Sequence, residues 1–184
     1  MVNKIIQGVL VVAIVVLSYL IYDSIRKPIR FQEERDKRYA KIIERLKDIR
    51  TAELGFYEKY GRYTANFDSL IQFIKTDSMP IVKAIGTVPD TLTEEQAIKM
   101  KLVYRDTINI AIKDTLFPKG FIADSLKYVP FSNGLIFKLQ AGEIVTGSKI
   151  KVKVFEAADP QPFDPTFQLK VGSMTEASTS GNWE

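Results

Sequence analysis

The chain of 184 residues contains no histidine and no cysteine. Histidine is the commonest general base and metal ligand in proteins, so its absence removes the usual groups for proton transfer and metal coordination near neutral pH. The absence of cysteine excludes thiol nucleophiles, zinc–thiolate sites, iron–sulfur clusters and disulfides. The two glycine motifs that bind nucleotide phosphates are also absent. We therefore expect a protein that is not an enzyme, with no catalytic residues, no cofactor and no metal site.

The remaining composition is that of a folded protein, with 46% hydrophobic and 26% charged residues. A chain with this balance can bury a core, which excludes a disordered stalk. The formal net charge of +4 is small and is spread along the chain. We therefore expect no nucleic-acid partner.

One uncharged apolar run occupies residues 5–22, with the sequence IIQGVLVVAIVVLSYLIY. As a helix it would span roughly 27 Å, close to the thickness of a hydrocarbon core. Its apolar side chains would lie on all sides of the helix, whereas a buried core helix, the alternative, usually has one apolar stripe. No small-residue cleavage pattern follows Tyr22, which favours an uncleaved single-pass anchor over a secretory signal peptide.

The segment after this anchor is basic, and Arg26, Lys27 and Arg30 are the cations closest to it. We expect these three residues to contact anionic lipid headgroups, at about 1 kcal/mol for each charge. The positive-inside rule would leave the following domain in the cytoplasm. The opposite orientation is implied by a family resemblance described below.

Apolar residues at three- and four-residue spacing predict an amphipathic stem helix over residues 31–60, with Gly61 as its C-terminal cap. Pro28 is expected to interrupt and kink the helix between anchor and stem. The last residues are small and polar. The expected division is an anchor with a juxtamembrane kink (1–30), a stem with a globular domain (31–173) and a disordered tail (174–184).

Two short helices are expected after the stem, over residues 67–75, where Asn66 is the N-cap, and over residues 94–101. The hydrophobic period then changes from helical to alternating. This alternation predicts strands near residues 108–112, 135–139, 150–154 and 167–171.

Strands with one apolar and one polar face are typical of an antiparallel sheet with one side in water. The apolar face of such a sheet needs a cover, and the stem helix has a matching stripe. The expected fold class is therefore α+β, with a long N-terminal helix, part transmembrane and part amphipathic, packed on an antiparallel sheet.

Two surfaces are candidates for binding. Lys149, Lys151 and Lys153 alternate along one expected strand and would project from one face toward an anionic partner, or would simply form a solvated face that discourages edge aggregation. A group of aromatic residues near the end of the stem could form a carbohydrate or partner platform, or could pack in the core between two helices. This group contains Phe56, Tyr57, Tyr60, Tyr63, Phe67 and Phe73.

The stem ends in the segments 50–53 (RTAE), 56–57 (FY) and 60–63 (YGRY). These segments, together with the order of apolar helix, amphipathic continuation and antiparallel sheet, resemble type IV pilins and type II secretion pseudopilins. The chain is also similar to single-pass envelope proteins of bacteria. The resemblance implies a bacterial inner-membrane protein whose C-terminal domain is periplasmic. The prepilin cleavage junction is absent, since Gly8 precedes Val9 and no acidic residue occurs before Asp23.

The preferred interpretation is a non-enzymatic, membrane-anchored envelope subunit that presents a pilin-like interaction domain. Its partners would be the lipid bilayer, other envelope proteins and further copies of the chain through the stem helix. The alternative is a cytoplasm-facing domain that binds anionic lipid or forms a coiled-coil scaffold.

Overall fold

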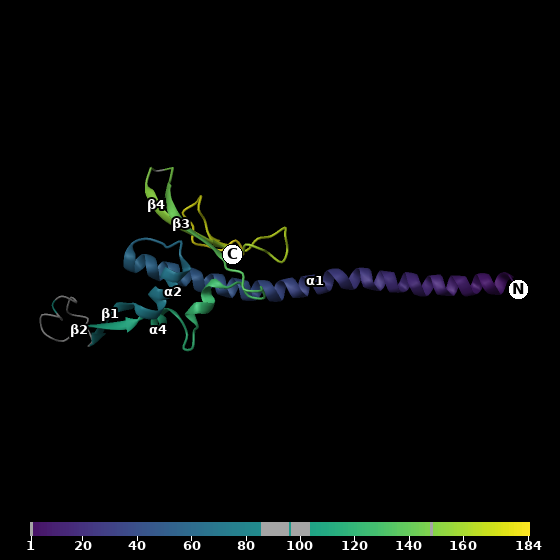
Figure 1. Cartoon of the computed structure of the whole chain (residues 1–184), viewed down its shortest axis with the longest axis horizontal. Helices are drawn as coiled ribbons and strands as arrows, with labels where there is room; N and C mark the ends of the chain where they lie inside the picture. The colour runs from purple at the N-terminus through teal and green to yellow at the C-terminus, as the bar shows by residue number, and fades with distance from the viewer. Residues whose placement is uncertain (1, 86–95, 97–103, 148) are drawn as a thin grey trace.

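A computed structural model of the chain describes residues 2–85, 96, 104–147 and 149–184. It confirms the α+β class: one long helix, α1 (Val2–Tyr60), carries a head of short helices and small antiparallel sheets (Figure 1). At 1.5 Å per residue α1 is about 88 Å long. Its N-terminal half projects alone from the head.

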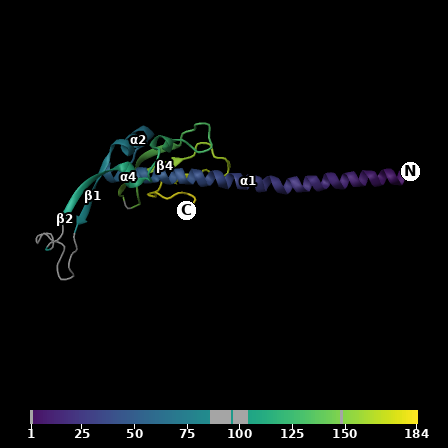
Figure 2. The ribbon, with the colours of Figure 1, turned by 90° about the horizontal axis from the view of Figure 1, so that it is seen from below.

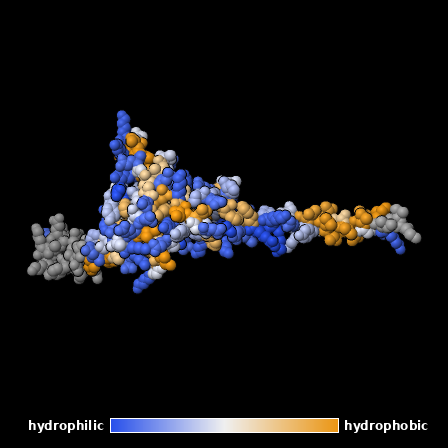
Figure 3. Space-filling model, viewed as in Figure 1, coloured by the Kyte–Doolittle hydropathy of each residue, from blue (hydrophilic) through white to orange (hydrophobic). Residues whose placement is uncertain are grey.

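The two halves of α1 differ in what surrounds them. The large apolar side chains from Ile6 to Ile25 are each 50–67% exposed. In the second half, side chains three or four residues apart are buried against the head; they include Ile42, Leu46 and Ile49. Figure 3 shows the exposed apolar stretch in orange, followed by a blue polar band and then the head.

The expected interruption at Pro28 is wrong, because α1 continues through this residue as one helix. Pro28 removes one helical hydrogen bond, the one to the carbonyl of Ser24. Ser24 is exposed, so solvent or a headgroup can take the place of the missing donor. An ion pair of 2.6 Å between Lys27 Nζ and Asp23 Oδ2 spans the same turn. The helix looks nearly straight in two perpendicular views (Figure 1 and Figure 2).

The turn from α1 to the next helix follows the local signals in the sequence. Gly61 has φ +65° and its N–H donates to the Tyr57 carbonyl at 2.7 Å, as expected for a C-terminal cap. Helix α2 (Phe67–Thr76) begins where the Asn66 side chain accepts a hydrogen bond from the Asp68 N–H at 2.8 Å. Both caps are confirmed.

The strands form two separate sheets instead of the single expected one. The first is an antiparallel ribbon of β1 (Ser78–Ile85) and β2 (Tyr104–Ala111) that extends away from the head (Figure 2). Pro80 lies within β1, where a two-stranded ribbon tolerates its missing donor. The expected helix over residues 94–101 falls outside the described residues, apart from the helical Gln96.

The second sheet has three antiparallel strands in the order β3-β4-β5, namely β3 (Lys138–Val145), β4 (Lys151–Ala158) and β5 (Lys170–Gly172). Ile112 starts the short helix α4 (Ile112–Leu116) instead of ending a strand, and a 3₁₀ helix η1 (Ala123–Lys127) follows. The second half of α1 contacts α2, α4, η1 and β5. The side chains fully buried between these elements include Leu46, Ile49, Leu70, Ile74, Leu126, Phe155 and Leu169.

The C-terminal tail, expected to be disordered, folds back along β5. Gly181 forms a bridge with Val171, and the Gly172 N–H donates to the Ser180 carbonyl at 2.9 Å. Trp183 packs against the core, and Glu184 pairs with Arg50 at 2.7 Å. Small polar residues can therefore satisfy the free edge of a sheet, and one aromatic side chain adds the apolar contact.

Candidate functional site

The apolar half of α1 is the first candidate site. Within the described residues, Ile6–Tyr60 is one helix whose N-terminal part is long and apolar enough to cross a membrane, and none of that part is buried by the head. The apolar side chains surround the helix on every side, as a lipid environment requires. The geometry is compatible with a single-pass anchor.

The three basic residues next to the apolar segment are exposed and lie together. Arg26, Lys27 and Arg30 fall within about one turn of α1, so the helix presents them at the same height. The Arg26 guanidinium lies 5.0 Å from the centre of the Tyr22 ring, a cation–π distance. Lys27 forms an ion pair with Asp23, which offsets part of its charge. These three cations lie on one side of the helix, where they suit phosphate groups at a membrane surface.

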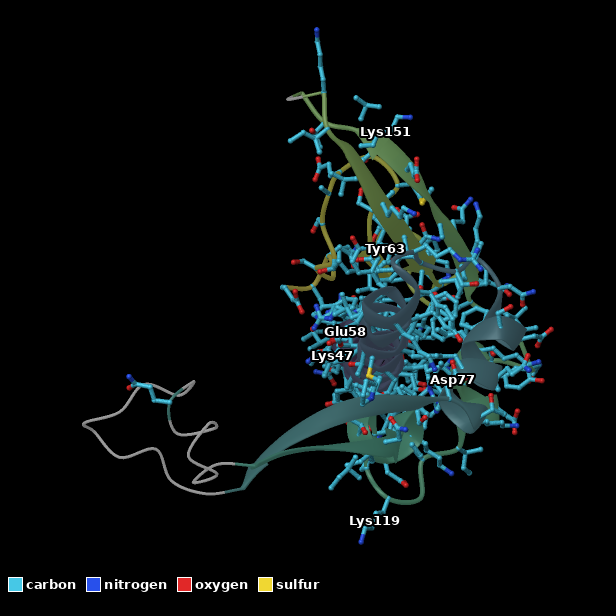
Figure 4. The ribbon with its side chains drawn as sticks, turned by 90° about the vertical axis from the view of Figure 1, so that its left-hand side faces the viewer. Lys47, Glu58, Tyr63, Asp77, Lys119 and Lys151 are labelled. Carbon is cyan, nitrogen blue, oxygen red and sulfur yellow. The ribbon has the colours of Figure 1, made fainter. Side chains whose placement is uncertain are left out.

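The lysine surface differs in part from the expected one. Lys151 and Lys153 lie on the same side of β4, but Lys149 lies in the preceding turn with φ +60°. Lys153 Nζ is 3.7 Å from Glu143 Oε1, which offsets part of its charge. Lys151 stands near the tip of the β3–β4 hairpin, far from the end of α1 in Figure 4. The structure therefore gathers Lys149 and Lys151 at a hairpin tip and does not give one uniform basic face.

The aromatic group at the end of the stem separates into two sets. Phe56, Phe67 and Phe73 are buried, as expected of core residues. Tyr57 and Tyr60 remain 41% and 48% exposed, respectively. Tyr63 is partly buried against the core and stacks on Tyr57, with ring centroids 4.7 Å apart. The sequence spacing could not separate buried from exposed rings, because it does not show which of them α2 covers.

A shallow cavity of about 310 Å³ lies between the end of α1 and α2. The Phe56, Tyr60 and Phe73 rings contact one another there, at centroid distances of 4.6 to 6.0 Å. The remaining lining is polar and consists of Arg62, Ser69, Gln72, Thr76 and Asp77. This mixed lining is more polar than that of most small-molecule sites, which would favour a polar ligand with one apolar face.

Three charged or polar groups close one side of this cavity. The Tyr60 hydroxyl donates to Asp77 Oδ2 at 2.5 Å, and Lys59 Nζ lies 3.0 Å from the same oxygen. The hydrogen bond from Tyr60, with a smaller contribution from Lys59, lowers the pKa of Asp77. Asp77 is therefore an anion at neutral pH, and the contact ties the end of α1 to the base of β1. Figure 4 shows Asp77 beside α2, viewed toward the end of α1.

Glu53 is a buried carboxyl group that the sequence analysis did not single out. Its Oε2 accepts a hydrogen bond of 3.0 Å from the Thr64 N–H, whereas Oε1 has no partner among the described residues. Burial raises the pKa of Glu53 to about 8, more than the hydrogen bond from Thr64 lowers it. The signal was present in the sequence, since Glu53 is four residues after Ile49 and three before Phe56, on the buried stripe.

A second cavity, of about 410 Å³, lies against α1 nearer the anchor, where Arg38 stands between two aromatic rings. Its guanidinium is 4.5 Å from the centre of the Phe163 ring and 5.8 Å from that of Phe131. Arg38 Nε also donates to Glu34 Oε1 at 2.8 Å. These contacts already engage the Arg38 guanidinium, so it is not free to bind a ligand. We interpret the arrangement as structural, since it fixes two loops of the head onto the stem.

No family model, curated protein or solved structure matches the chain.

Proposed function

We propose that the chain is a non-enzymatic, single-pass subunit of the bacterial inner membrane that holds a pilin-like interaction domain in the periplasm. The observation that carries this proposal is the division of α1. Its first half is apolar and exposed on every side, and its second half is part of the core of the head.

The exposed apolar half of α1 would be costly to keep in water. Leaving one Val, Leu or Ile side chain in water, when it could be buried, costs roughly 1.5–3 kcal/mol. Over the run from Ile6 to Ile25 the total is on the order of tens of kcal/mol, more than the 5–15 kcal/mol that stabilises an average domain. A surface this costly in water supports burial in a bilayer.

The second half of α1 would set the height of the head. Close to the anchor, Phe31 of α1 stacks on Phe163 of the head, with ring centroids 5.1 Å apart. Phe31 follows Tyr22 by nine residues, or about 14 Å along the helix, which exceeds the depth of a headgroup layer. Such a head would stand just above the membrane and expose its sheets to other proteins.

The partners would be other envelope proteins, which would bind the head, and further copies of the chain. The apolar stripe formed by Ile42, Leu46 and Ile49 is already covered by the head. A coiled coil between copies would therefore have to use residues 23–38 or the anchor itself. Photo-crosslinking from the head of the membrane-embedded chain, followed by mass spectrometry, should recover envelope proteins. Recovery of lipid alone would contradict this part of the proposal.

Orientation is tested by two single cysteines, which are unique because the chain has none of its own. Lys119 lies in an exposed turn of the head and Asn3 lies at the other end of α1. In intact spheroplasts, a membrane-impermeant maleimide should label Lys119→Cys, and should label Asn3→Cys only after permeabilisation.

The second candidate is a cytoplasm-facing domain that binds anionic lipid or serves as a scaffold. The exposed cations Arg26, Lys27 and Arg30 favour it, because the positive-inside rule places such residues in the cytoplasm. In that case the labelling pattern would be reversed, with Asn3→Cys reacting in intact spheroplasts and Lys119→Cys protected.

A further inference from the structure

We infer that the shallow cavity between the end of α1 and α2 binds one pyranose ring of a glycan. The inference uses contacts within the head and holds for either orientation of the protein in the membrane.

The aromatic wall of the cavity is Tyr60, an exposed ring that is held in place at both ends. Its hydroxyl donates to Asp77, and its ring packs against Phe56 at 4.6 Å between centroids. Exposed aromatic side chains ordinarily lose rotamer freedom when a ligand binds, and this ring has already lost it. A flat, fixed, half-exposed ring is suited to stacking against the C–H face of a sugar.

The polar wall supplies unused hydrogen-bonding groups. Among the described residues, the side chains of Arg62, Ser69 and Gln72 have no hydrogen-bond partner, although all three line the cavity. Together they offer a guanidinium donor, a hydroxyl group that can donate and accept, and an amide that does both. Adjacent sugar hydroxyls present the same alternation of donors and acceptors.

Asp77 completes this pattern as a fixed acceptor. One of its oxygens, Oδ2, accepts the hydrogen bond from Tyr60 and forms the ion pair with Lys59. The other oxygen, Oδ1, has no hydrogen-bond partner within the described part of the chain. A carboxylate held in this way accepts strong hydrogen bonds from hydroxyl groups. The site thus combines a stacking surface, an anionic acceptor and neutral and cationic donors.

The size and shape of the cavity restrict the ligand further. About 310 Å³ is at the lower end of the range for small-molecule sites, so one ring fits and a longer chain must extend into solvent. The cavity is open and its rim is polar. Because most of the lining is polar, an unbranched apolar ligand would find little apolar surface there, which argues against lipid tails and hydrophobic peptides.

The test titrates the full chain, in detergent micelles, with tri-N-acetylglucosamine and with maltotriose, monitored by NMR or calorimetry. We expect one of these probes to bind with a dissociation constant on the order of 1 mM, as for a ligand with few polar contacts. Gln72→Ala and Arg62→Ala should each weaken binding by about fivefold while the melting temperature stays unchanged. The control Lys119→Ala, remote from the cavity, should bind as the parent chain does.

Two variants of Tyr60 separate a binding role from a purely structural one. Tyr60→Phe keeps the ring but removes the hydroxyl group that fixes both the ring and Asp77, and should bind about threefold more weakly than the parent chain. Tyr60→Leu, verified as folded by its melting curve, should bind about tenfold more weakly. If neither probe binds at about 10 mM, or if all four variants bind as the parent does, the inference is overturned.

Discussion

At the scale of single residues, Glu53 is the group whose chemistry depends most on burial. Its side chain is fully buried, and its pKa is raised from 4.5 to about 8. The folded state therefore holds the neutral acid over a pH range in which the unfolded chain has already lost the proton.

Because the pKa of Glu53 is higher in the folded chain, the stability of the fold should fall as the pH rises. The stabilising contribution of neutral Glu53 is complete below pH 4.5 and is lost as the pH rises toward about 8, at about 1.4 kcal/mol per pH unit. Glu53→Gln keeps an acceptor for the Thr64 N–H and cannot ionise. Urea unfolding between pH 5 and 8, followed by tryptophan fluorescence, should be less pH-dependent in this variant. The exposed Glu58→Gln is the control, and equal slopes for Glu53→Gln and the parent chain would contradict the assignment.

Substituting alanine for two glycines with positive φ should lower the free energy of unfolding by very different amounts. At Gly172 (φ +75°) a Cβ atom would overlap the backbone carbonyl of Phe155, whereas at Gly61 (φ +65°) it would meet open space. Gly61→Ala should therefore lower the free energy of unfolding by about 1 kcal/mol, from backbone strain alone. Gly172→Ala should cost about 3 kcal/mol or more, because β5 must also move away from β4. Equal costs in urea unfolding would show that β5 does not pack as described.

At the scale of secondary-structure elements, the C-terminal tail makes the most specific prediction. Trp183 is the one tryptophan in the chain, and it packs against the core. Its fluorescence should shift to longer wavelength when the protein unfolds. Trp183→Ala should cost about 2 kcal/mol, less than for a fully buried tryptophan, as measured by circular dichroism against the remote control Lys119→Ala. An emission maximum that is identical in folded and unfolded chains would restore the sequence-based view of a disordered tail.

Elements with local signals could be predicted from the sequence, and elements that depend on distant pairing could not. Gly61 and Asn66 act on backbone groups within four residues, so the boundaries they set were predicted correctly. The pairing of Gly181 with Val171 and the separation of β1–β2 from the other sheet depend on which edge remains free after folding. The composition of a segment does not show which sheet edge it will pair with.

The same distinction applies to the candidate site. The aromatic residues near the end of the stem were visible as a cluster, but only the folded chain separates the buried Phe56 and Phe73 from the exposed Tyr60. The contact between Tyr60 and Asp77 joins two elements seventeen residues apart in sequence. Lys149 was assigned to a strand because alternation continues into the turn, where φ +60° places it outside the ladder.

At the scale of the whole molecule, the two halves of α1 have different surroundings although they form one continuous helix. Its apolar half has no cover within the described chain, and its amphipathic half is inseparable from the core of the head. Because the helix is continuous through Pro28, the position of the head follows from the position of the anchor. Membrane attachment is therefore the claim on which the proposed height, partners and orientation depend.

The most direct measurement is the intact mass of the protein recovered after an alkaline carbonate wash of the membranes. We predict that the protein stays in the pellet, because burial of the apolar half is worth on the order of tens of kcal/mol, and that its mass includes residues 5–22. Recovery in the supernatant, or a mass showing that the mature chain begins after Tyr22, would contradict the account.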